Sequence, residues 1–199
     1  AFRTDRDKAI TFTPKRDAGD EMWSWIPGYS LRRLRELKLV TSSETSLLGG
    51  DIVATHALLE RKVASAAVAA LEWRAVVLVG AGEAGAGYTA LDVTAPNDPQ
   101  MLWEITPDRH CWGPGTSLNG VSGPKCALSN TFVGMGRSTA KPILARAYYK
   151  HNGATVERTV AIIAAGMPPN DSSVSNVGVD GNGERAIYIV ELATGRLVR

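Results

Sequence analysis

Alternation of apolar and polar positions runs through most of the chain and predicts short β-strands. Segments rich in β-branched and aromatic residues are bounded by Gly, Pro, Asn or Asp, which is typical of strands joined by tight turns. The strands that we predict are residues 19–27, 49–60, 73–80, 87–96, 100–107, 141–150, 156–166 and 184–198. Residues 73–80 are almost continuously apolar, which predicts a strand buried on both faces, whereas 87–96 and 100–107 alternate.

Residues 30–40 instead have helical periodicity. Leu31, Leu34 and Leu37 would share one face, and Ser30 is a suitable N-cap. The basic residues between these leucines would then point outward, and we interpret them as a solvated helix face rather than a binding surface.

Three connections differ in how well their patterns define them. Residues 61–72, "RKVASAAVAALE", are compatible with helical turns or with a strand return. Residues 151–154, "HNGA", contain the Asn-Gly pair typical of a β-hairpin, and residues 167–184 read as a long polar loop.

A weak internal repeat organises these strands. "EMWSWIP" superposes on "QMLWEITP", with Trp23 on Trp103 and Pro27 on Pro107. "YTALDVTAPNDPQMLW" and "IYIVELATGRLV" share an alternating strand, an acidic residue, a turn with Thr and an apolar strand. Such units predict an all-β fold with β-propeller blades and one short helix. Because about two to three blades fit in this length, we expect residues 1–199 to be part of one larger propeller domain.

Composition adds little about partners. With 44% hydrophobic and 21% charged residues, the 199-residue chain has globular proportions. Its 22 basic and 20 acidic residues are too balanced to indicate nucleic acid or an anionic membrane as a partner. No apolar run approaches the roughly 18 residues of a transmembrane helix.

The glycines of "VGAGEAG" match the spacing of a dinucleotide-binding turn at Gly80, Gly82 and Gly85. That motif requires a helix after the glycines, but Gly87 is followed at once by a strand pattern. Asp92 lies only 12 residues after Gly80, whereas the ribose-binding acid is expected after about 20. We therefore interpret the glycines as a wide hairpin loop and predict no cofactor site.

Cys111 and Cys126 lie in a Gly/Pro/Ser-rich stretch and are a disulfide candidate. A bridge there would close a flexible loop and stabilise the protein by about 3 kcal/mol in an oxidising compartment. Free buried thiols remain an alternative. Zinc is a weaker one, because His110 is nearby but no Cys-x-x-Cys pair or fourth ligand is present.

The remaining motifs do not support a catalytic or metal site. Ser138–Lys141 matches Ser-x-x-Lys of penicillin-binding enzymes but lacks its companion motifs. Asp180–Glu184 alternates oxygen ligands like a calcium loop, yet Arg185 occupies the sixth position, where glycine is needed. His56 and His151 have no neighbour at ligand or triad spacing, so we predict no catalytic residue and no metal ligand.

Taken together, "GDEMWSWIP", "WRAVVLVGAGEAGAGYTALDVT", "QMLWEIT", "GRSTAKPILARA" and "ERAIYIVELATGRL" resemble the C-terminal β-propeller of PilC/PilY-type type IV pilus tip adhesins and biogenesis factors. The resemblance covers most of the chain and departs at residues 61–72 and 111–126. The positions that form its structural motif are Trp73, Arg74, Gly80, Gly82, Gly85, Gly87, Asp92 and Trp103.

This resemblance implies a non-enzymatic, extracellular protein at the pilus tip, exported through the periplasm and outer membrane. Its implied partners are minor pilins, the pilus fibre and a host-cell or abiotic surface, and its implied roles are adhesion, pilus assembly and twitching motility. The family's Asp-rich calcium loop is expected after residue 199, so we transfer no metal or other cofactor to this segment. There are two alternatives. One is the propeller of a quinoprotein dehydrogenase, because "YTALDVTAPNDPQMLW" also resembles the blade repeat of those enzymes. The other is an extracellular binding propeller unrelated to pili.

Overall fold

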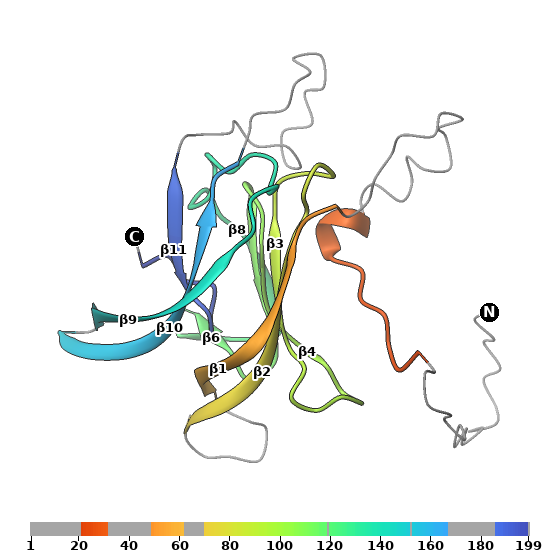
Figure 1. The fold of residues 1–199 in the computed structure, drawn as a ribbon. Helices are drawn as coiled ribbons and strands as arrows, with labels where there is room; N and C mark the ends of the chain where they lie inside the picture. Colours follow the sequence, from red (N-terminus) through yellow and green to blue (C-terminus); the bar gives the residue numbers. More distant parts are fainter. Residues whose placement is uncertain are drawn as a thin grey trace, which may run out of the picture.

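Antiparallel β-strands make up nearly all of the regular structure (Figure 1). The structure is a computed structural model that describes residues 21–31, 49–61, 70–118, 120–151, 153–166 and 186–198. Within these ranges the strands are β1 (Ile52–Arg61), β2 (Ala70–Gly80), β3 (Tyr88–Asp92), β4 (Gln100–Ile105), β5 (Arg109–Trp112), β6 (Ser117–Leu118), β7 (Val121–Ser122), β8 (Lys125–Leu128), β9 (Ile143–His151), β10 (Ala154–Ala164) and β11 (Ile187–Glu191). The all-β prediction is therefore confirmed.

The larger sheet has six strands in the order β1-β2-β3-β4-β5-β8, and each strand is antiparallel to its neighbours. A bulge between Ala90 and Leu91 shifts the register of β3 against β4. The short β6–β7 hairpin forms between β5 and β8.

The smaller sheet has the order β11-β10-β9. Its β9–β10 hairpin is the one that we predicted, because His151 pairs with Ala154 and Gly153 has a φ of 81°. After β11 the chain returns beside it, and Leu197 forms an isolated bridge with Val190.

The two sheets pack face to face over one hydrophobic core. Trp103 of β4 is fully buried, and its Nε1 donates a hydrogen bond of 2.8 Å to the carbonyl of Leu192, beyond β11. Thr159 of β10 donates to the carbonyl of Leu58 on β1 at 2.8 Å. Side chains from both sheets share this core, among them Leu59, Val76, Leu78, Tyr88, Trp103, Ile105, Ala161, Ile163 and Val190.

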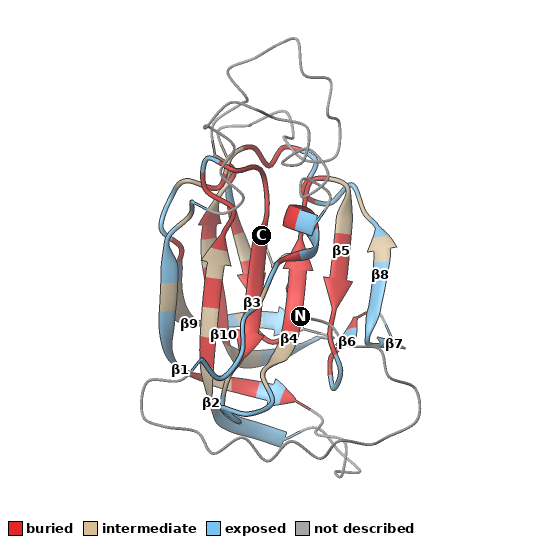
Figure 2. Cartoon of the chain, turned by 90° about the vertical axis from the view of Figure 1, so that its right-hand side faces the viewer, coloured by how far each residue is buried: buried red, intermediate tan, exposed pale blue. Residues whose placement is uncertain are grey.

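The end of the N-terminal segment, residues 27–31, lies against the other face of the six-stranded sheet, where the Gly28 amide bonds to Glu104 of β4 (Figure 2). We predicted a strand over 19–27, but residues 21–27 pair with no strand in the described chain. The segment crosses a sheet face, where no ladder hydrogen bonds are offered, instead of extending an edge.

The predicted helix begins earlier than expected. A single helical turn covers residues 28–31, and the amides of Ser30 and Leu31 both donate to the carbonyl of Pro27, at 3.0 and 3.2 Å. Ser30 is thus inside the turn and is not the N-cap that we predicted. The rest of the predicted helix lies outside the described residues.

The sequence predicted that β2 is buried on both faces and β3 on one, but the structure shows the opposite. In β2 only every second residue of the apolar half is buried, with Val77 and Val79 half-buried and Trp73 63% exposed. All five residues of β3 are buried instead. In β3 the inner residues Tyr88 and Ala90 belong to the shared core, and Asp92 pairs with buried Arg61. On the outer face, Thr89 lies beside Glu104 and buried Tyr29 of the N-terminal segment. Figure 2 shows β3 in the red of buried residues and β2 partly in tan.

Two further predictions need correction. Trp103 is buried in β4, whereas Trp23 is 36% exposed outside any strand, so the proposed equivalence of these two residues is wrong. The Gly/Pro/Ser-rich stretch contains strands β5 to β8, which we did not predict.

The uncertain segment 61–72 is in part a strand return, because Arg61 ends β1 and β2 begins at Ala70. Residues 62–69 lie outside the described residues. So do the predicted polar loop 167–184 and the Asp180–Glu184 motif within it. Among the helices of the described chain, none has the length and apolarity needed to cross a membrane.

Candidate functional site

The glycine-rich loop, residues 81–87, connects β2 to β3 as a wide hairpin. Gly82 has a φ of 67°, and a Cβ there would lie 2.2 Å from the carbonyl carbon of Gly49, so only glycine fits. The Ala81 amide donates to the carbonyl of Gly87 at 2.9 Å, which closes the loop. Strand β3 stands where the dinucleotide motif needs a helix, which confirms the hairpin interpretation.

Ser138 holds this loop in place. Its Oγ accepts a hydrogen bond from the Gly87 amide at 2.9 Å, and its carbonyl accepts one from the Gly82 amide at 3.2 Å. Ser138 is fully buried, whereas Lys141 is exposed, and residues 138–141 are not helical. The loop contact, rather than a Ser-x-x-Lys pair, explains the serine at this position.

A group of charged and polar residues lies at the end of β3, and we call Arg61, Arg74, Asp92 and Thr94 the Asp92 cluster; Arg61 and Asp92 are buried. Asp92 Oδ2 accepts from Arg61 Nη1 at 2.6 Å and lies 3.8 Å from Arg74 Nη1. Asp92 Oδ1 accepts from the Thr94 amide at 3.0 Å and from its hydroxyl at 2.6 Å. Burial alone would raise the pKa of Asp92, but the hydrogen bonds from Thr94 and the charge of Arg61 hold it below its usual value.

A second group, the Glu191 cluster, lies at the end of β11 and consists of Arg158, Glu191, Thr194 and Arg196. Glu191 Oε2 accepts from the Thr194 hydroxyl at 2.7 Å and lies 3.2 Å from Arg196 Nη2. Arg158 Nε lies 3.6 Å from Glu191 Oε1, and Arg158 Nη2 pairs with Glu60 of β1, which links the two sheets.

The two clusters occupy equivalent positions in their sheets. Arg74 lies two residues before Val76, the partner of Asp92 across β2 and β3. Arg158 likewise lies two residues before Val160, the partner of Glu191 across β10 and β11. The repeat therefore includes the preceding strands, "WRAVVLVG" and "ERTVAIIA", a signal in the sequence that we missed.

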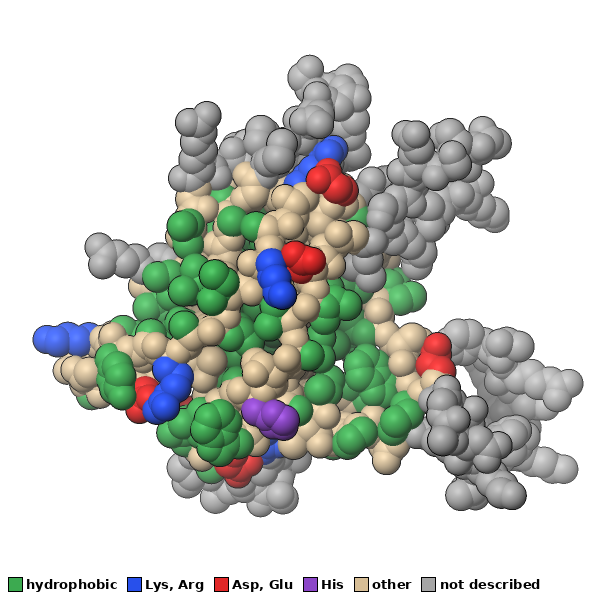
Figure 3. Space-filling view, in the orientation of Figure 1, with side chains coloured by type: hydrophobic (Ala, Val, Ile, Leu, Met, Phe, Trp, Pro, Cys, Tyr) green, Lys and Arg blue, Asp and Glu red, His purple; other side chains and the backbone are tan. Residues whose placement is uncertain are grey.

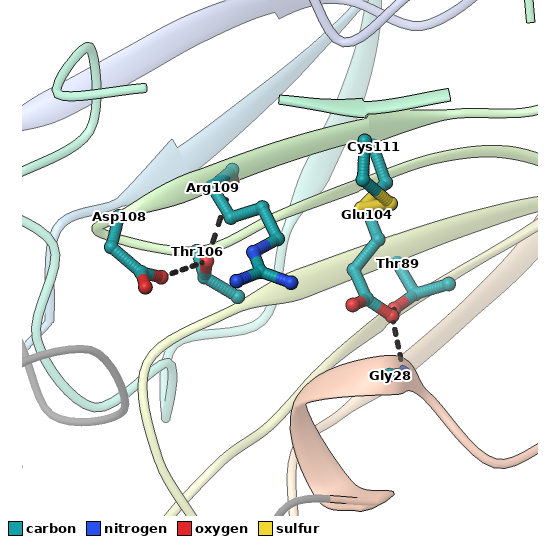
Figure 4. The surroundings of a disulfide bond; sticks show 8 residues. Gly28, Thr89, Glu104, Thr106, Asp108, Arg109 and Cys111 are labelled. Carbon is teal, nitrogen blue, oxygen red and sulfur yellow. Dashed lines mark hydrogen bonds between the residues drawn. A yellow bond between two sulfur atoms is a disulfide. The ribbon is translucent and has the colours of Figure 1, made fainter. Parts of the chain in front are cut away.

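The two cysteines form a disulfide between neighbouring strands of the six-stranded sheet. Cys111 of β5 and Cys126 of β8 are directly paired, with a Cα–Cα distance of 4.0 Å. The bridge joins two strands rather than closing an unstructured loop, and both sulfurs are used, so the free-thiol and zinc alternatives do not apply. Figure 4 shows Cys111 beside Glu104, its partner on β4.

Glu104 attaches the N-terminal segment to the sheet on this same face (Figure 4). Its Oε2 accepts from the Gly28 amide at 2.7 Å and from the Thr89 hydroxyl at 3.3 Å. Tyr29, next to Gly28, is 6% exposed, and its burial raises its pKa well above the usual value. A Cβ on Gly87 would lie 2.9 Å from Tyr29 Cδ1, so this glycine leaves room for the tyrosine ring.

His110 of β5 lies between the two sheets. Its Nε2 is 3.2 Å from the carbonyl of Thr194, and its ring makes edge contacts with Trp112 and Phe132. Burial lowers the pKa of His110 to about 4, and the hydrogen bond with Thr194 opposes this shift. The imidazole is therefore neutral near pH 7 and packs as part of the core.

The other predicted residues have separate surroundings. His56 is exposed on β1, and His151 Nδ1 lies 2.6 Å from Arg196 Nη1. Gly80 has no room for a side chain, because a Cβ would lie 2.8 Å from the carbonyl oxygen of Ser138. Gly85 lies in the hairpin loop, where its amide donates to the carbonyl of Gly82 at 3.4 Å. No group of three His, Cys, Asp or Glu side chains in the described part of the chain is placed to hold a metal ion.

Two antiparallel sheets packed face to face, each with an acid–arginine–threonine cluster at the end of an equivalent hairpin, define the fold as an all-β repeat. The fold is similar to that in the crystal structure of the Pseudomonas aeruginosa PilY1 C-terminal domain, with a TM-score of 0.50 and 21% sequence identity. The similarity covers 92% of this chain and 26% of that chain, so this chain spans about a quarter of its length. No protein-family model and no curated protein matches the sequence.

Proposed function

We propose that this chain is part of a β-propeller domain in a non-enzymatic type IV pilus adhesin and assembly factor. The observation that carries the proposal is the fold similarity to the PilY1 C-terminal domain. The family motif supports it, because Arg74 and Asp92 of that motif meet in one buried cluster.

The repeat of the two clusters supports the propeller architecture. Strands β2 and β3 correspond to β10 and β11, as expected for two consecutive blades. The outer face of the three-stranded sheet is also apolar: Ile143 and Ile187 are 61% and 68% exposed, and Ile162 pairs with Ile143 on the same face. Figure 3 shows hydrophobic side chains over this side of the molecule, on the left. A neighbouring blade would cover such a face.

An extracellular location, with minor pilins, the pilus fibre and a host-cell or abiotic surface as partners, follows from the same proposal. The disulfide supports it, because a bridge between β5 and β8 is stable in the periplasm and outside the cell. A rigid propeller with variable loops suits a protein that must bear retraction force while it contacts a surface.

Deletion of the gene in its native host tests the pilus role. We expect loss of surface pilin in sheared fractions and loss of twitching, and recovery of surface pili when the retraction ATPase is also deleted. Normal piliation and twitching in the single deletion would contradict the proposal and favour an unrelated extracellular propeller.

The quinoprotein dehydrogenase is the second candidate, favoured by the blade repeat that contains Asp92 and Trp103. Purified protein incubated with pyrroloquinoline quinone and calcium, then desalted, separates the two functions. We expect no bound quinone absorbance, and stoichiometric binding would replace the pilus proposal with an enzymatic one.

A further inference from the structure

A pocket of about 500 Å³ opens beside the Asp92 cluster. Arg61 and Arg74 form its inner wall, and the turn between β3 and β4 contributes Asp98 and Gln100. The β6–β7 hairpin contributes Ser117 and Ser122 to the lining. The volume lies within the range of about 300–1,000 Å³ that is usual for small-molecule sites.

The inner wall is fixed before any ligand binds. Arg61 is 8% exposed, and besides its bond to Asp92 it donates from Nη2 to the carbonyl of Pro114. Asp92 accepts from Arg61 and Thr94 on separate oxygens, so its carboxylate is already occupied. Arg61 Nε is buried, so the donors that Arg61 still has for a ligand are the second N–H groups of Nη1 and Nη2.

The rim adds polar groups of both kinds. Ser117 and Ser122 are directly paired across β6 and β7, so both exposed side chains are on one side of the hairpin. Asp98 is exposed, and its Oδ1 accepts from Gln100 Nε2 at 2.7 Å, which orients the amide. Ala95 and Pro114 provide small apolar contacts between these polar groups.

The lining combines hydrogen-bonding side chains with a larger share of apolar surface, and its charges are balanced, because Arg61 and Arg74 are matched by Asp92 and Asp98. A balanced lining does not favour an anion or a cation. It suits a ligand with many hydroxyl groups, each of which both donates and accepts, and with C–H faces for the apolar contacts. We propose that this pocket binds a neutral saccharide.

Saturation-transfer NMR on the purified protein tests the proposal with lactose, maltose and N,N′-diacetylchitobiose as neutral probes. Glucuronate and inorganic phosphate serve as anionic probes. We expect ring-proton signals from at least one neutral disaccharide, with a dissociation constant of about 1 mM or lower. No signal from any neutral probe, or tighter binding of either anion, would overturn the proposal.

Variants of the exposed rim locate the binding. We expect Asp98→Ala and the double variant Ser117→Val/Ser122→Val to weaken saccharide binding by roughly tenfold each, the loss of about one hydrogen bond of 1.4 kcal/mol. Glu83→Ala removes a carboxylate at the opposite end of β2 and should leave binding unchanged. Equal binding by all variants would place the saccharide elsewhere and refute the pocket as its site. Saccharide binding does not depend on the pilus role, so the failure of either proposal leaves the other standing.

Discussion

The Asp92 and Glu191 clusters are alike in residue types and in strand register but differ in where their second arginine comes from. Arg61, which pairs with Asp92, belongs to β1, and its side chain is 8% exposed. Arg196, which pairs with Glu191, follows β11 in the chain, and its side chain is 27% exposed. The same repeated hairpin therefore carries a deeply desolvated ion pair in the larger sheet and a partly solvated one in the smaller sheet.

Charge removal should produce the largest difference between the two clusters. We expect Asp92→Ala to lower the free energy of unfolding by roughly 3–5 kcal/mol, because it leaves buried Arg61 without its carboxylate. Glu191→Ala should cost less, about 1–3 kcal/mol, because water reaches Arg196. Urea unfolding of both variants measures the difference.

The double variant Arg61→Leu/Asp92→Ala is the control for that prediction. Removal of both charges should recover part of the loss, since no uncompensated charge then stays buried. Equal losses in Asp92→Ala and Glu191→Ala would contradict the contrast between the clusters.

The titration of His110 tests whether water is excluded from the contact between the two sheets. Its pKa is about 4 in the folded protein and 6.5 in the unfolded chain, so only the unfolded chain takes up a proton between these values. The free energy of unfolding should therefore fall by about 3 kcal/mol as the pH drops from 6.5 to 4. Urea unfolding across this range measures the slope.

The pH slope should be smaller in His110→Phe, which removes the buried imidazole. Asp92 contributes at lower pH, since its lowered pKa means that its stabilisation is lost below about 3.8. If the free energy of unfolding of the wild-type protein did not change between pH 6.5 and 4, water would have access to His110 in the contact between the sheets.

The disulfide joins two strands of the six-stranded sheet, so its loss should affect that sheet most. We expect Cys111→Ser/Cys126→Ser to lower the free energy of unfolding by about 3 kcal/mol, from the loop entropy of the 15-residue separation. Hydrogen exchange should accelerate in β5 and β8 more than in β9 and β10. Equal acceleration in both sheets would mean that the bridge supports the whole core.

Loss of the contact between the N-terminal segment and the six-stranded sheet should have the smallest and most local effect. A Cβ on Gly28 would lie 2.7 Å from Glu104 Oε1, so Gly28→Ala should displace the N-terminal segment and cost about 1–2 kcal/mol. Limited proteolysis within residues 21–31 should become faster, whereas exposed Ser24→Ala should leave the rate unchanged. Unchanged proteolysis in Gly28→Ala would show that the Glu104 contact does not hold the segment.

Strands with a strong local pattern were predicted well from the sequence. Strand β9, strand β10 and the turn at Gly153 follow from alternation and from Asn-Gly, which act between neighbours in the chain. The strand expected over 19–27 was wrong, because a strand needs a partner with free ladder groups and no local pattern reveals one. Strands β5 and β8 were missed because pairing of distant residues overrides a Gly- and Pro-rich composition.

For the candidate sites, too, the sequence identified individual residues but not the contacts between them. The sequence identified Cys111, Cys126 and Asp92 as residues of interest, but the pairing of Asp92 with Arg61 depends on β1 lying two strands away from β3. The pocket depends further on the β6–β7 hairpin, whose position is set by tertiary contacts such as that from Trp112 Nε1 to the Val121 carbonyl at 3.0 Å.

Local chain chemistry by itself determined the all-β class, most strand positions and the hairpin loop around Gly82. Only the tertiary structure decided which strand faces are buried, because burial depends on what covers a face and not on the face itself. Strand β3 shows this most clearly. Its alternating sequence allows one face to be exposed to water, but the N-terminal segment, attached through Glu104, lies beside Thr89 on that face, and all five residues of β3 are buried.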